Sequence, residues 1–173
     1  MSQVNESFFK KHDEEGGSRR ILKNWNLKLV GFLAITWSLF QLWYASPLPF
    51  LLDFGKFIDV PARAIHLAFG MSLCFLAYPV LKSKRNSSIG TVDFILALVS
   101  ILVTFYLVIE YERLVYRQGI LASIDFFGLI IPYELILGSF GVLLLLEATR
   151  RAIGIPLVAI ALIFLLFSIF GQK

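Results

Sequence analysis

Five ionisable residues stand at the edges of long apolar blocks, where their side chains could carry chemistry: Asp59, Arg63, His66, Glu110 and Glu134. Ionisable groups are costly in hydrocarbon, so each raises the question of a function. His66 would lie about one turn inside a helix, and Glu110 and Glu134 at helix ends, so all three are expected at one depth. They could form a proton relay or a ligand site. The alternative is a satisfied network that ties helix ends to loops or to a partner.

A second set of charges, Asp93, Glu147, Arg150 and Arg151, lies near the opposite ends of these blocks. Asp93 would fall in the first turn of a helix, where the helix dipole favours a carboxylate. Glu147 precedes Arg151 by four residues, a spacing that allows an ion pair on one helix face. The charged stretch 147–151 is therefore predicted to anchor a tight turn between two helices rather than to catalyse a reaction.

No motif of an enzyme or a cofactor site occurs in the sequence. It contains no phosphate-binding glycine loop, no HExxH, no paired CxxC and no nucleophile elbow. The single cysteine, Cys74, excludes an internal disulfide and a thiolate metal cluster. We therefore expect no catalytic, substrate-binding or metal-binding residue, and no cofactor.

The elements that would position these charges are membrane helices. Hydrophobic residues make up 58% of the chain and charged residues 16%, whereas about a quarter of a soluble domain is charged. Five stretches have the roughly 17–25 apolar residues that cross a bilayer: 27–45, 61–81, 91–109, 132–148 and 153–170. The sequence thus predicts an all-α integral membrane protein, a bundle of about five transmembrane helices.

Three parts follow from this pattern: a polar cytoplasmic tail (1–26), a four-helix membrane domain (27–148), and an Arg-Arg turn with a fifth transmembrane helix (149–173). The connections 46–60 and 110–131 mix charges with prolines or aromatic residues. Amphipathic segments of this kind lie in the membrane surface. Both are predicted to be half-buried, interfacial arms on the outer side.

The distribution of lysine and arginine predicts the orientation. With the N-terminus inside, eleven of the 16 basic residues fall on the inner side and five on the outer side. Basic residues gather on cytoplasmic ends, so the N-terminus is expected in the cytoplasm and the C-terminus outside. The net charge of +4 has the same explanation, and no nucleic-acid partner is expected.

Small residues mark the surfaces along which these helices would associate. Ala64, Ala68 and Ser72 recur every four residues on one predicted helix, and Gly138 and Gly141 share another. Membrane helices pack closely through such surfaces. By contrast, the spans show no internal repeat and no broken helix of the kind that forms a transport pathway. The chain is therefore expected to be too simple for a complete transporter.

Two stretches resemble the fused permeases of tripartite ATP-independent periplasmic (TRAP) transporters of the TAXI subclass. They are "RAIHLAFGMSLCFLAYP" (63–79) and "LEATRRAIGIPLVAIALIFLLFSIFG" (146–171). Arg63, His66, Leu67, Tyr78 and Pro79 fit the first pattern. Glu147, Thr149, Arg150 and Arg151 fit the second. The resemblance covers roughly 60–171.

The resemblance implies a scaffold role in the bacterial inner membrane. A small subunit of four helices accompanies a large permease subunit, which holds the substrate and sodium sites and moves in an elevator-like way. A periplasmic binding protein delivers organic acids such as 2-oxoglutarate or glutamate, and a sodium gradient drives uptake. The expected partners are that large subunit, the binding protein and membrane lipids. The fifth helix resembles the connection to the large subunit.

Two other interpretations remain open from the residues alone. The chain could be an unrelated small membrane protein for assembly or regulation. It could also be a membrane enzyme or proton-handling protein that uses His66 with Glu110 or Glu134.

Overall fold

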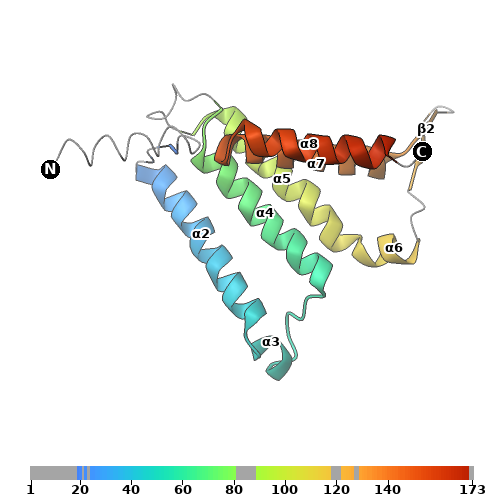
Figure 1. Ribbon diagram of the computed structural model, residues 1–173. Coiled ribbons are helices and arrows are strands. Elements are labelled where there is room, and N and C mark those ends of the chain that lie inside the picture. The colour runs from blue at the N-terminus through green and yellow to red at the C-terminus, as the bar shows by residue number, and fades with distance from the viewer. Residues whose placement is uncertain are drawn as a thin grey trace, which may run out of the picture.

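The computed structural model describes residues 19–20, 22, 24–80, 89–117, 122–126 and 129–171. Within them lie seven helices and two short strands (Figure 1): α2 (Asn24–Ala45), α3 (Leu48–Leu51), α4 (Asp59–Ala77), α5 (Thr91–Ile109), α6 (Tyr111–Tyr116), β1 (Ile124–Phe126), β2 (Leu129–Ile131), α7 (Tyr133–Ala152) and α8 (Ile155–Phe170). The strands pair antiparallel, with Asp125 opposite Ile130. The predicted helical character is confirmed, and the small hairpin lies within the connection 110–131.

Three helices are long and apolar enough to cross a membrane. The qualifying segments are Trp25–Ala45, Asp59–Ala77 and Thr91–Ile109, in α2, α4 and α5. A helix of 19 residues is about 28 Å long, close to the roughly 30 Å of a bilayer's hydrocarbon core. These helices are compatible with a membrane-embedded protein.

The helix α4 ends four residues before the predicted span 61–81 does. Its last residue is Ala77, and Tyr78 is extended, with φ −115° and ψ 111°. Tyr78 precedes Pro79, and the proline ring pushes the preceding residue out of the helical region. The predicted boundary was wrong because the apolar run continues beyond Ala77, whereas backbone sterics before Pro79 end the helix there.

The helix α7 extends past the predicted span 132–148 to Ala152, so Arg150 and Arg151 lie in its last turn. The prediction that they form the connecting turn was wrong. The connection consists of Ile153 and Gly154, after which α8 runs back beside α7 (Figure 1). A helix tolerates arginines in its last turn because its carbonyl end carries a partial negative charge.

Replacing Gly154 by alanine should lower the free energy of unfolding by roughly 1–3 kcal/mol. Gly154 has φ +117° and ψ −176°, a backbone conformation that is essentially restricted to glycine. The matched control is Gly31→Ala in α2, where an added Cβ would meet nothing within 4 Å; it should be neutral or stabilise by up to about 1 kcal/mol. Thermal unfolding in mild detergent measures both variants. Equal effects would contradict the assigned need for glycine at this turn.

The core lies where α4, α5 and α7 meet. The most extensive packing is between α4 and α5, while α2 packs on α4, α7 packs on both, and α8 packs mainly on α7. The buried apolar cluster contains Phe75, which is completely buried, together with Met71, Leu76, Ala97, Val103, Leu144 and Ala148. These side chains fix the mutual positions of the helices that carry the charged residues.

Small residues are found within this packing. In α4, Ala64 and Ser72 are buried and Ala68 is half-buried. Between α5 and α7, a Cβ added to Gly141 would come within 3.1 Å of Val103 Cγ1. A side chain at this position would press on Val103, so the packing of α5 on α7 favours a small residue here.

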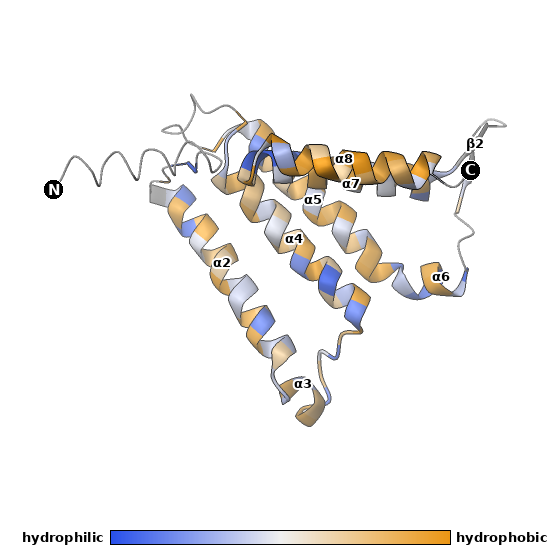
Figure 2. Cartoon of the chain, viewed as in Figure 1, coloured by the Kyte–Doolittle hydropathy of each residue, from blue (hydrophilic) through white to orange (hydrophobic). Residues whose placement is uncertain are grey.

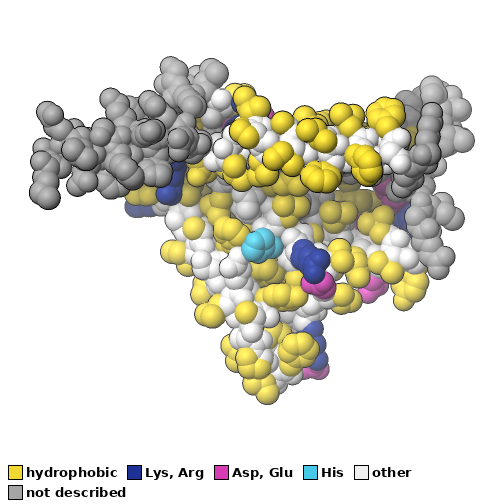
Figure 3. Space-filling model, viewed as in Figure 1, with side chains coloured by type: hydrophobic (Ala, Val, Ile, Leu, Met, Phe, Trp, Pro, Cys, Tyr) yellow, Lys and Arg dark blue, Asp and Glu magenta, His cyan; other side chains and the backbone are white. Residues whose placement is uncertain are grey.

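Apolar side chains cover most of the outer surface. No residue of α8 is buried, and this helix is hydrophobic along its whole length (Figure 2). Figure 3 shows the same apolar covering in the space-filling view. Phe167 in α8 is 71% exposed and Phe32 in α2 is 68% exposed. A monomeric soluble protein rarely exposes so much contiguous apolar surface, whereas hydrocarbon tails cover it at no cost.

Candidate functional site

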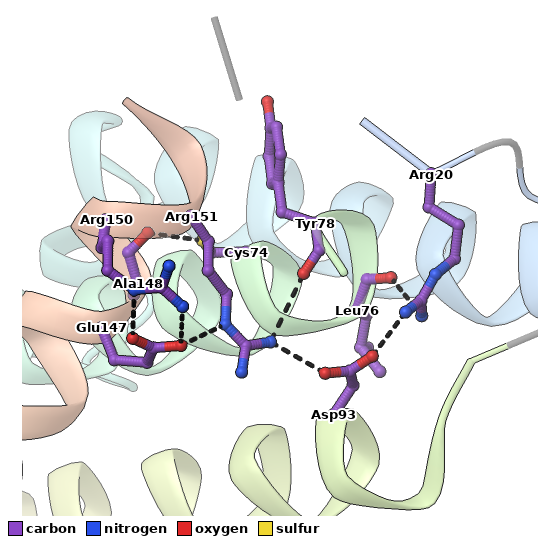
Figure 4. Close-up of polar contacts among 9 residues, drawn as sticks. All are labelled: Arg20, Cys74, Leu76, Tyr78, Asp93, Glu147, Ala148, Arg150 and Arg151. Carbon is purple, nitrogen blue, oxygen red and sulfur yellow. Dashed lines mark hydrogen bonds and ion pairs between the residues drawn. The ribbon is translucent and has the colours of Figure 1, made fainter. Parts of the chain in front are cut away.

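A buried carboxylate, Asp93 in the first turn of α5, is the centre of a network of charges (Figure 4). Its side chain is 6% exposed. Arg151 Nη1 donates to Asp93 Oδ1 at 2.8 Å, and Arg20 Nη2 donates to Asp93 Oδ2. Both carboxylate oxygens are therefore engaged by guanidinium groups from distant parts of the chain.

Arg20 joins the segment before α2 to the end of α4. Its backbone N–H donates to Ala77 O at 2.7 Å, and its Nη1 donates to Leu76 O at 3.3 Å. The side chain is only 1% exposed. Its Nε is buried without a partner among the described residues. The carbonyl end of α4 thus receives a cation, as the helix dipole favours.

Arg151, in the last turn of α7, reaches the same end of α4. Its Nη1 also lies 3.4 Å from Tyr78 O, and its Nε donates to Glu147 Oε1 at 2.8 Å. The guanidinium carbon lies 5.0 Å from the centroid of the Phe75 ring. This contact adds a cation–π attraction in a desolvated setting.

Glu147 completes the group by binding two arginines. Arg150 forms a bidentate pair with it, with Nε–Oε2 at 2.7 Å and Nη2–Oε1 at 2.8 Å. We call Arg20, Asp93, Glu147, Arg150 and Arg151 the inner ion network. It ties the segment before α2, the end of α4, the start of α5 and the end of α7 into one unit. With both oxygens of each carboxylate occupied, the network is suited to holding helices together rather than to binding a ligand.

A second group of charges lies at the other end of α5 and α7. Glu134, whose side chain is 2% exposed, accepts hydrogen bonds from Tyr106 Oη at 3.1 Å and Ala122 N at 2.6 Å. Arg117 Nη1 lies 2.9 Å from Glu134 Oε1, and Arg117 Nη2 lies 3.9 Å from Glu110 Oε2. Arg113 also pairs with Glu110, at 3.3 Å. We call Glu110, Arg113, Arg117 and Glu134 the outer ion cluster.

His66 belongs to a separate site between α2 and α4. Its Nδ1 lies 3.4 Å from Trp37 Nε1 and 3.1 Å from Gln41 Nε2. An indole N–H can only donate, so Nδ1 is the acceptor in the contact with Trp37. His66 is exposed. Within the described residues, no hydrogen bond links it to Glu110 or Glu134, whereas Arg117 does bring those two carboxylates together.

Asp59 and Arg63 form an ion pair across one turn of α4. Their side chains are 60% and 75% exposed, and an exposed pair of this kind contributes about 0–1 kcal/mol. The two residues are four apart, a spacing that allows an ion pair on one helix face, and the pair is peripheral to both groups of charges.

Sequence reasoning missed several of the contributing residues. Arg20 was assigned to the polar tail 1–26, and its burial has no local signal, because the adjacent Arg19 has the same sequence environment and is exposed. The tail boundary also falls inside α2, which begins at Asn24; residues 1–18 lie outside the described part. Arg117 and Trp37 were likewise not singled out. Each has its role through contacts with residues distant in the sequence.

Metal binding finds no support in the described part of the chain. There, no group of three or more His, Cys, Asp or Glu side chains is placed to hold an ion. Comparison with known proteins gives no further assignment, because the chain matches no family model, no curated protein and no solved structure. We therefore infer its function from its own residues and contacts.

Proposed function

We propose that this chain is the non-catalytic scaffold subunit of a sodium-coupled TRAP transporter of the TAXI subclass. It would accompany a large permease subunit and a periplasmic binding protein in the bacterial inner membrane. The transporter would import organic acids such as 2-oxoglutarate or glutamate. In this proposal the present chain supplies a rigid support, and the substrate and sodium sites belong to the large subunit.

The observation that carries the proposal is the contact between the two stretches that resemble those permeases. Arg151 lies against Tyr78 O and the ring of Phe75. Cys74 Sγ lies 3.1 Å from Ala148 O. The stretches 63–79 and 146–171 are far apart in the sequence, yet they meet at the inner ion network. Arg151 of the second stretch is occupied in joining α7 to α4 and α5, which is consistent with a scaffold.

The proposed topology has five crossings, by α2, α4, α5, α7 and α8. The charges of α7 are confined to its ends, Glu134 in the first turn and Glu147, Arg150 and Arg151 near the last. The twelve residues between Glu134 and Glu147 carry no charge. With the N-terminus in the cytoplasm, as the basic residues favour, α8 would end on the periplasmic side. The segments with α3, and with α6 and the hairpin, would be the interfacial arms.

Co-purification tests the proposal. The full chain with an N-terminal tag would be extracted from its native membranes in mild detergent, and bound proteins identified by mass spectrometry. We expect a stoichiometric polytopic partner, either separate or continuous with this chain. An unrelated membrane protein with the same tag and several apolar helices serves as the control for nonspecific capture.

The outcomes separate the interpretations of the sequence. A partner of TRAP-permease type would support the scaffold role. A monodisperse chain without any partner would contradict it. A stoichiometric partner of another class would favour a protein for assembly or regulation.

A further inference from the structure

An apolar groove runs between α4, α5, α6 and α7, with a volume of about 320 Å³. Its wall includes Leu67, Met71, Leu107, Leu137, Gly138 and Val142. Within the described residues, a Cβ added to Gly138 would meet nothing within 4 Å. The missing side chain of Gly138 therefore leaves space for an occupant rather than allowing another helix of this chain to approach.

The chemistry of the lining limits what can occupy the groove. Apart from Thr104, Tyr106 and Glu134, the lining residues are apolar or glycine. Most of the groove therefore offers water no hydrogen-bond partner. A narrow apolar chain fits, and an empty groove would forfeit the dispersion contacts of its walls.

The groove has the length and the polarity of one half of a bilayer. Its lining extends along α7 from Glu134 to Leu145, about 16 Å at 1.5 Å per residue. The chain region of one leaflet is about 15 Å thick, half of the hydrocarbon core. At the Leu145 end the lining is apolar. At the other end lie Tyr106 and Glu134, where α5 ends and α7 begins. An occupant with an apolar body and a polar head matches this arrangement.

A cation is available for a phosphate at the polar end. Arg113 is adjacent to Leu114, which lines the groove, and its side chain is 74% exposed. Within the described residues its Nη1 alone contacts Glu110, at 3.3–3.4 Å, so other guanidinium donors remain for a phosphate. The two arginines and two glutamates of the outer ion cluster cancel in charge, and Glu112 on α6 is exposed as well. This balance favours a zwitterionic headgroup over an anionic one.

We propose that the groove between α4 and α7 is a binding site for one acyl chain of a zwitterionic phospholipid, with the phosphate at Arg113. The site requires that the chain lies in a bilayer, and it does not require the transporter assignment. Bound in this way, the lipid completes the packing between α5 and α7 and anchors the start of α7 at the headgroup level.

Photolabelling of the purified full chain tests the proposal without any substitution. The probe is a phosphatidylethanolamine with a diazirine in its acyl chain, and labelled residues are located by mass spectrometry. We expect labelling of groove residues such as Leu107 and Leu137 that saturates and is displaced by unlabelled phosphatidylethanolamine, less well by phosphatidylglycerol. Labelling of α8, for example at Phe167, should rise without saturation. If the groove residues behave like α8, the site does not exist. Stronger displacement by phosphatidylglycerol would overturn the assigned headgroup.

A matched pair of substitutions gives the second test. Gly138→Phe should fill the groove and lower retained phosphatidylethanolamine about ten-fold, equivalent to about 1.4 kcal/mol of binding free energy. Gly31→Phe in α2, where an added Cβ also meets nothing within 4 Å, should retain the wild-type amount. Both variants must be monodisperse, and if Gly138→Phe is not, the photolabelling result decides. Equal retention by the two folded variants would overturn the proposal.

Discussion

Replacing Asp93 by asparagine should lower the free energy of unfolding by about 3–5 kcal/mol, the cost of removing one partner from a buried ion pair. Arg20 would lose its negative partner and Arg151 would keep only Glu147, and the two arginine side chains are 1% and 2% exposed. Because both guanidinium groups are buried, neither can reach water. Neither can release its proton, because arginine stays charged in proteins. Thermal unfolding in mild detergent, followed by circular dichroism, measures the loss.

The matched control is Asp59→Asn. Asp59 also begins a helix and also pairs with an arginine, but its side chain is 60% exposed. Its replacement should cost no more than about 1 kcal/mol. If Asp93→Asn were no more harmful than Asp59→Asn, the inner ion network would not hold the helices together.

Replacing Glu134 by glutamine should cost about 1–3 kcal/mol, the range for leaving buried hydrogen-bond partners unsatisfied. The amide removes the charge opposite Arg117 and keeps only one oxygen for the hydrogen bonds from Tyr106 and Ala122. The effect should be smaller than that of Asp93→Asn, because Arg117 is 30% exposed and can turn to solvent or headgroups. We also expect faster hydrogen exchange at the Ala122 amide.

Glu112→Gln is the control for this second substitution. Glu112 lies in α6 near the same cluster, but its side chain is exposed. Exposed substitutions of this kind change stability by about ±0.5 kcal/mol. Wild-type exchange at Ala122 in the Glu134→Gln protein would contradict the assigned hydrogen bond.

Local pattern accounts for the helices and for the charge pairs within them. Apolar runs and their lengths indicated α2, α4 and α5, and the four-residue spacing of Glu147 and Arg151 indicated their ion pair. These features depend only on neighbouring residues and on the helical repeat. They are therefore the part of the fold that could be predicted from the sequence.

The remaining features depend on contacts across the chain. Arg20 and Asp93 are 73 residues apart, and no spacing rule connects them. The length of α7 was underestimated because two adjacent arginines were interpreted as a turn. In the structure both lie within the helix, where Glu147 pairs with Arg150 and the carbonyl end of α4 accepts from Arg151. The division between the two groups of charges and the separate site of His66 likewise follows only from how the helices pack.

The attachment of α8 has a mechanical consequence. Its packing is mainly on α7, and it continues from the glycine turn directly after the inner ion network. The inner ion network holds the end of α7 in place, and α8 extends about 24 Å from the turn that follows it. A rotation of about 10° at Gly154 would displace the far end of α8 by about 4 Å. Because α8 packs on α7, such a displacement would have to overcome this packing before it reached the buried charges.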